Sequence, residues 1–66
     1  MTNLEFRDIR KQLGLTQAGL TDLLGYGAAV RISEFERETN PRPVPHALGL
    51  LMTAYAEGYR PKGWPK

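Results

Sequence analysis

The chain has 66 residues, of which 41% are hydrophobic, and nine Lys and Arg against seven Asp and Glu give it a formal net charge of +2. This length allows one domain with one small core, and such a chain buries so little surface on folding that self-association is favoured. Cysteine is absent and His46 is the single histidine, which excludes disulfide bonds, zinc sites and cysteine- or histidine-based catalysis within one chain. We therefore expect no enzyme, no metal or cofactor and, without a pocket-forming motif, no small-molecule ligand.

Nothing in the sequence indicates a membrane protein. No apolar run approaches the roughly 20 residues that cross a bilayer. Glu5, Arg7, Asp8 and Arg10 stand where a signal peptide would be apolar. Together with the lack of cysteine, these features lead us to expect a cytoplasmic protein without a membrane partner.

The net charge is too small to identify a polyanionic partner, so the positions of the cations matter more. Three arginines lie around the middle of the chain: Arg31, Arg37 and Arg42. The last seven residues contain three cations and no acid: Arg60, Lys62 and Lys66. For each arginine a solvated surface charge is an open alternative, and the terminal group fits either a phosphate-binding arm or a disordered basic end.

Two N-terminal helices are predicted from their caps and their apolar spacing. Thr2 and Glu5 form a capping box for a helix that begins near residue 3 and stops at Gly14. Thr16 caps a second helix over about residues 17 to 24, which Gly25 ends. The apolar residues at helical spacing are Phe6, Ile9 and Leu13, then Leu20, Leu23 and Leu24.

A sharp turn separates the second helix from a short third one. Gly25 and Gly27 flank Tyr26, and glycine tolerates the positive φ that such a turn needs. The third helix is expected from about residue 28 to residue 36, with Ile32 and Phe35 as its core-facing pair. Two short helices joined by a glycine turn, each with an exposed front, form a helix-turn-helix.

A proline-rich strut leads to the last helix. Residues 39–45 hold three prolines at alternate positions, which favour an extended segment, and Pro45 fits a first helical turn. The core positions of this helix are Leu48, Leu51, Met52 and Tyr55. Gly58 ends it. We therefore predict an all-α, compact domain of four helices, or five, over residues 1–58 and an extended basic, aromatic-containing tail over residues 59–66.

Specific residues in this pattern match a known family. They are residues 6–10 and 13–18, Leu20, Leu24, Gly25, Ile32 and residues 35–37. With them, residues 4 to about 57 resemble the phage-repressor and Cro type of helix-turn-helix transcription factors, the XRE family, which implies a lambda-repressor-like fold. The chain departs from the usual pattern by one extra residue after Gly25, by Thr21 in place of a small residue, and by Gly19 inside a helix.

The resemblance also implies roles for particular residues. Gln17 would contact a DNA phosphate or base, and residues 29–34 would enter the major groove. Arg10 would pair with Glu36 and lock the third helix to the scaffold.

Side-chain chemistry divides the candidate DNA contacts into two groups. Arg31 can hold guanine O6 and N7 together, Ser33 can bond a base edge or phosphate, and Ala29 and Val30 can touch a thymine methyl, with core packing as the alternative for Val30. Glu34 is better suited to a surface or intramolecular role, since an acid near phosphates is unfavourable. The candidate phosphate contacts are Thr16, Gln17, Arg37, Asn40 and Arg42.

These features predict a sequence-specific transcriptional repressor that controls its own operon. It would bind an inverted repeat in double-stranded DNA as a homodimer, because one short helix contacts too few base pairs. The candidate dimer residues are Ala47, Leu50, Ala54, Tyr59 and Trp64. For the two aromatics, packing on their own domain or insertion beside DNA stay open. An antitoxin-like protein-binding module is the alternative function, and the chain is also similar to regulators of phage operons, including anti-CRISPR-associated ones.

Overall fold

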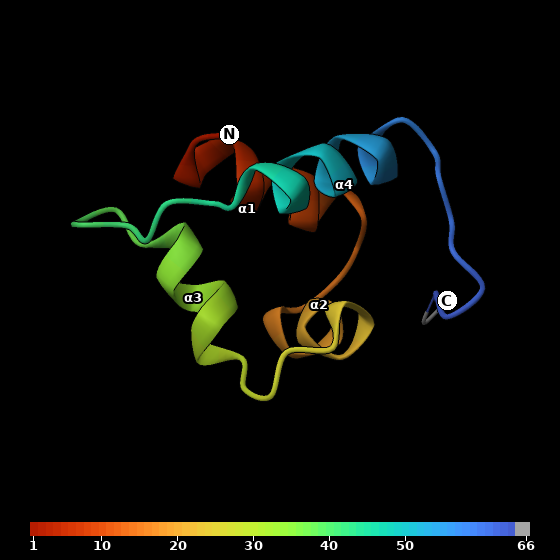
Figure 1. The fold of residues 1–66 in the computed structure, drawn as a ribbon, viewed down its shortest axis with the longest axis horizontal. Helices are drawn as coiled ribbons and strands as arrows, with labels where there is room; N and C mark the ends of the chain where they lie inside the picture. Colours follow the sequence, from red (N-terminus) through yellow and green to blue (C-terminus); the bar gives the residue numbers. More distant parts are fainter. Residues whose placement is uncertain (65–66) are drawn as a thin grey trace.

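The computed structural model describes residues 1–64, which form four α-helices and no β-strand. The helices are α1 (Asn3–Gln12), α2 (Gln17–Leu24), α3 (Val30–Glu36) and α4 (His46–Ala56). In Figure 1, α1 and α4 lie together along one side, α2 lies opposite them, and α3 stands towards one end. Packing joins α1 to both α3 and α4, and α2 to α3. The expected all-α class is confirmed, with four helices in the described residues.

The helices α1 and α2 begin at the residues predicted to cap them. The Thr2 hydroxyl accepts a hydrogen bond from the Glu5 N–H at 3.1 Å, and the Glu5 carboxylate accepts one from the Thr2 N–H at 2.9 Å. Hydrogen bonding of the Glu5 carboxylate by the Thr2 backbone N–H, and then by the Thr2 side chain, holds the pKa of Glu5 below its ordinary value. At α2, the Thr16 hydroxyl accepts from the Gly19 N–H at 2.9 Å, and Gly25 ends the helix at a φ of 78°.

The start of α3 differs from the sequence prediction. The helix begins at Val30 rather than near Ala28. Its N-cap residue, Ala29, has no side-chain oxygen and makes no capping hydrogen bond, so no side chain fixes an earlier start. The turn between α2 and α3 is therefore longer than predicted. With seven residues, α3 is too short to be stable by itself and depends on its packing.

The core draws one large side chain from each helix. Phe6, Leu20, Ile32 and Met52 are fully buried, and each such burial contributes about 1.5–3 kcal/mol. The rings of Phe6 and Phe35 lie 5.5 Å apart between centroids. Ile32 and Phe35 are thus the core-facing pair of α3, as predicted, and the opposite side of this helix is left open.

After α4 the chain folds back onto that helix. The Trp64 ring meets the Tyr55 ring edge-on at 5.1 Å between centroids and lies 4.4 Å from the guanidinium carbon of Arg60. Tyr59 stacks on Tyr55 at 5.9 Å. Burial, and to a lesser extent the neighbouring Tyr59, raise the pKa of Tyr55. The tail that was predicted to be extended is therefore tied to α4 as far as Trp64, while Lys66 lies outside the described residues.

Residues 1–64 contain neither a membrane-spanning helix nor a group of side chains arranged for a metal ion. None of the helices there has the length and apolar character needed to cross a membrane. In the same residues, no three His, Cys, Asp or Glu side chains are grouped so that they could hold a metal ion.

Candidate nucleic-acid interface

A buried ion pair connects α1 to the end of α3. Arg10 Nε donates to one Glu36 carboxylate oxygen at 2.6 Å, and Nη2 donates to the other at 3.0 Å, so the pair is bidentate. Arg10 Nη1 also donates to the Leu15 carbonyl at 2.9 Å. Both charged residues are buried. This geometry fixes α3 to α1 and to the loop before α2, through the two residues that the resemblance had paired.

Gln17, the first residue of α2, belongs to the same network. Its side-chain Nε2 donates to Glu36 Oε1 at 3.1 Å, and the residue is half-buried. The amide still has an acceptor oxygen and a second N–H to offer. A partner approaching the front of α2 would therefore meet an amide whose orientation is set by the end of α3.

The two unusual residues of α2 have local structural reasons. A Cβ at Gly19 would lie 3.3 Å from the Thr16 hydroxyl, which is tighter than an ordinary contact. Glycine therefore leaves the cap unobstructed, although it is about 1 kcal/mol less favourable than alanine inside a helix. Thr21 is buried, and its hydroxyl donates to the Gln17 carbonyl at 2.7 Å. The polar group of Thr21 is thus satisfied inside the helix.

The open side of α3 presents four of the predicted contact residues. Val30 is 59% exposed, so the alternative that it fills the core is wrong. Arg31 is also exposed, whereas Ala29 and Ser33 are half-buried. The first turn of α3 therefore combines an apolar group with a cation.

Glu34 holds two arginines beside this open side of α3. Its carboxylate oxygen lies 3.3 Å from Arg31 Nη1 and 3.6 Å from Arg42 Nη1. The arginine side chains keep 49% and 46% of their surface exposed. The sequence spacing predicts that Arg31 and Glu34 are neighbours on one helix, but no local pattern predicts that Arg42 lies beside them. The position of Arg42 depends on the path of the proline-rich loop.

The loop after α3 is fastened to α1. Arg37 Nη2 donates to the Asn40 carbonyl at 3.0 Å, with Asn40 at a φ of 48°, a conformation that asparagine adopts more readily than most residues. Asn3 Nδ2 donates to the Arg37 carbonyl at 3.0 Å, and Arg7 Nη1 lies 3.7 Å from the Glu38 carboxylate. Sequence reasoning missed Asn3 and Arg7, because these contacts join distant parts of the chain.

The predicted dimer residues lie in different surroundings. Leu50 is 60% exposed on α4, Ala47 is exposed and Ala54 is half-buried. Tyr59 is 53% exposed although it stacks on α4. Trp64 is half-buried and packs against its own domain. Among the alternatives left open for this residue, the structure therefore shows packing within its own chain.

No family model, no curated protein and no solved structure matches this chain. Its function therefore has to be inferred from its own residues. Those residues place an oriented amide on α2, a cation and an apolar side chain on the open side of α3, and a second exposed arginine on the following loop.

Proposed function

We propose that the chain is a sequence-specific DNA-binding repressor of transcription that acts in the cytoplasm and controls its own operon. The observation that carries this proposal is the bidentate Arg10–Glu36 pair with Gln17 bound to it. It holds the short α3 rigidly against the scaffold while the first turn of that helix stays open to a partner. Rigid presentation of a short helix suits insertion into a major groove.

The first turn of α3 would contact the bases. Arg31 supplies a planar fork of donors that matches guanine O6 and N7, and the exposed Val30 matches a thymine methyl. The half-buried Ala29 and Ser33 would contribute at the edge of the same contact. A cation beside an apolar group would distinguish guanine from thymine along one strand.

Phosphate contacts would surround this helix. At the front of α2, Thr16 and Gln17 lie where a helix N-terminus favours an anion. On the other side, the chain offers Arg42 from the proline-rich loop, with Arg37 and Asn40 at the start of that loop. Contacts from both sides would fix the orientation of α3 on the duplex.

Two copies would bind an inverted repeat. With seven residues, α3 is only about 10 Å long, which restricts one copy to a few base pairs. The longest dimension of the described chain is 33 Å, close to the roughly 34 Å between half-sites one helical turn apart. Two such copies side by side would therefore be large enough to contact two consecutive major grooves.

An electrophoretic mobility shift with the DNA upstream of the native gene tests the proposal. We expect a sequence-selective shift at micromolar protein that weakens steeply with salt. Arg31→Ala should relax the sequence preference, whereas Arg42→Ala should weaken binding to all sequences alike. The absence of any selective shift would overturn the proposed function, and the reverse pattern in the two variants would overturn the roles assigned to the arginines.

A further inference from the structure

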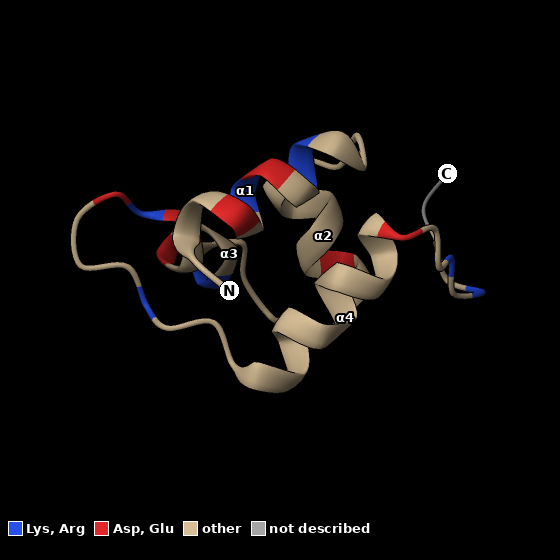
Figure 2. Cartoon of the chain, turned by 90° about the horizontal axis from the view of Figure 1, so that it is seen from above, with Lys and Arg blue, Asp and Glu red and all other residues tan. Residues whose placement is uncertain are grey.

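The loop between α3 and α4 projects from the body of the molecule. Figure 1 and Figure 2 both show it leaving the end of α3, passing beyond the helices and returning to the start of α4. Every residue from 37 to 43 is exposed. Within residues 1–64, the only backbone–backbone hydrogen bond of this range runs from the Arg42 N–H to the Glu34 carbonyl, at 2.9 Å. A loop with so few backbone bonds samples several conformations unless side chains hold it.

Two side-chain hydrogen bonds supply what the backbone of this loop lacks. Asn3 Nδ2 donates to the Arg37 carbonyl, and Arg37 Nη2 donates to the Asn40 carbonyl, both at 3.0 Å. Asn40 has a φ of 48°, a left-handed conformation that residues with a Cβ adopt infrequently and that needs support from its surroundings. A continuous series of hydrogen bonds therefore runs from α1 through Arg37 to Asn40.

Helix α1 does not itself require an asparagine at position 3. Its capping box is complete between Thr2 and Glu5, and alanine is a better helix former than asparagine. Asn3 is half-buried, and its amide N–H bonds the loop rather than its own helix. The contact with the Arg37 carbonyl is therefore the structural reason for an asparagine at this position.

Arg7, one turn further along α1, holds the loop less firmly. Its Nη1 lies 3.7 Å from the Glu38 carboxylate, which is too long for a hydrogen bond, and the Glu38 side chain is 80% exposed. Ion pairs in such exposed positions contribute little. Arg7 Nε is buried and has no hydrogen-bond partner in residues 1–64. Of the two contacts from α1, the hydrogen bond of Asn3 is therefore the stronger.

We infer that Asn3 is a positioning residue for the phosphate contacts of this loop. Its bond to the Arg37 carbonyl keeps Arg37 and Asn40 in the arrangement in which they meet a duplex, while Asn3 itself does not touch the duplex. The inference rests on the proposed function, which assigns Arg37 and Asn40 to phosphates. A loop that is already ordered loses less conformational entropy on binding. The apparent affinity for DNA therefore falls with the fraction of molecules whose loop has left this arrangement.

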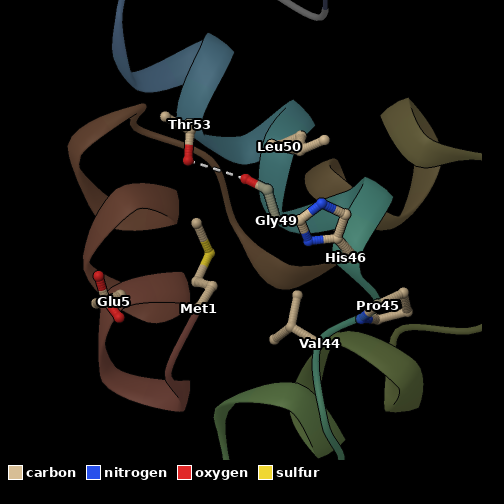
Figure 3. Close-up of a pocket in the computed structure, with 8 residues that line it drawn as sticks. All are labelled: Met1, Glu5, Val44, Pro45, His46, Gly49, Leu50 and Thr53. Atoms are coloured by element: carbon tan, nitrogen blue, oxygen red, sulfur yellow. Dashed lines mark hydrogen bonds between the residues drawn. The ribbon is translucent and has the colours of Figure 1, made fainter.

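Backbone NMR relaxation of the free chain tests the holding contact without DNA. Asn3→Ala removes the donor and leaves the capping box in place. We expect the order parameters of residues 38–40 to fall from about 0.85 to below about 0.6. Thr53→Ala is the matched control, because it also removes one side-chain bond to a carbonyl, from Thr53 to Gly49 at 2.9 Å on α4 (Figure 3). The control should leave residues 38–40 ordered. Unchanged order in Asn3→Ala would overturn the inference, whether or not the chain binds DNA.

A double-mutant cycle in DNA binding tests the consequence. With a random duplex, Asn3→Ala should weaken binding about threefold to tenfold, and Thr53→Ala should bind like the wild type. In the Arg37→Ala background, Asn3→Ala should weaken binding by less than about twofold, because the side chain that Asn3 positions is gone. An equal loss in both backgrounds would overturn the inference, since Asn3 would then contact DNA itself or act through overall stability. If the wild type binds no duplex while Asn3→Ala still loosens the loop, the proposed function falls and the holding contact stands.

Discussion

Glu34 holds Arg42 at two points, since its carbonyl accepts the Arg42 backbone N–H at 2.9 Å and its carboxylate lies 3.6 Å from Arg42 Nη1. The same carboxylate lies 3.3 Å from Arg31 Nη1. The Glu34 carboxylate thus pairs with two arginines, of which the proposed function assigns Arg31 to a base and Arg42 to a phosphate. In the free protein Glu34 orders these two side chains, whereas on DNA its negative charge would repel nearby phosphates.

Glu34→Gln should therefore strengthen binding to DNA of arbitrary sequence. Removal of one negative charge beside two half-exposed arginines is expected to raise the affinity about fivefold at low salt. The dependence of affinity on salt should become steeper, because both arginines can then neutralise phosphates. Fluorescence anisotropy with a random duplex measures both quantities.

Glu57→Gln makes the same charge change at the far end of α4 and serves as the control. It should leave the affinity for DNA close to that of the wild type. Weaker rather than stronger binding by Glu34→Gln would mean that the carboxylate itself accepts a hydrogen bond from a base, such as cytosine N4.

The buried pair should behave as a unit in stability measurements. Arg10→Met leaves the Glu36 carboxylate buried without its bidentate partner, and such a loss is expected to lower the free energy of unfolding by about 3–5 kcal/mol. The double variant Arg10→Met, Glu36→Leu should lose less than the sum of the two single variants, since neither charge then stays buried alone. Urea unfolding followed by circular dichroism provides the free energies. Additive losses would show that the two residues act independently.

Local signals in the sequence predicted most of the fold. Thr2, Thr16 and Gly25 act within one turn of their own helices, so the ends of α1 and α2 follow from short-range chemistry. The start of α3 was predicted too early because Ala29 provides no comparable signal. Apolar periodicity does not specify where a loop gives way to a helix without a cap.

The candidate site was harder to predict, because its contacts join distant parts of the chain. Gln17 could be recognised from its place at the front of α2, but the direction of its amide depends on Glu36. Likewise, Arg42 reaches Glu34 only through the path of the loop. The return of Trp64 to α4 has no periodic pattern at all, since it depends on aromatic contacts after the last helix has ended.

The capping box should contribute to the dependence of stability on pH. Hydrogen bonds from Thr2 lower the pKa of Glu5 from its ordinary value of 4.5. A lowered pKa in the folded state contributes stability that is complete above pH 4.5 and is lost as pH falls through the folded value. Glu5→Gln should therefore lose less stability than the wild type between neutral and acid pH. Thermal melts across this interval, with Glu57→Gln as the charge-matched control, measure the difference; parallel curves for wild type and Glu5→Gln would contradict it.

Trp64→Ala should destabilise the monomer without dissociating the dimer. The variant loses the edge-on contact with Tyr55 and the guanidinium of Arg60 over the indole, which together are worth about 1–3 kcal/mol. Since Trp64 is the single tryptophan of the chain, its fluorescence reports directly on this packing, and in the wild type its emission should shift to the red in step with the loss of helix in urea. A dimer interface on the tail predicts the opposite result, in which Trp64→Ala keeps its stability but sediments as a monomer, because the indole would then pack against the other copy.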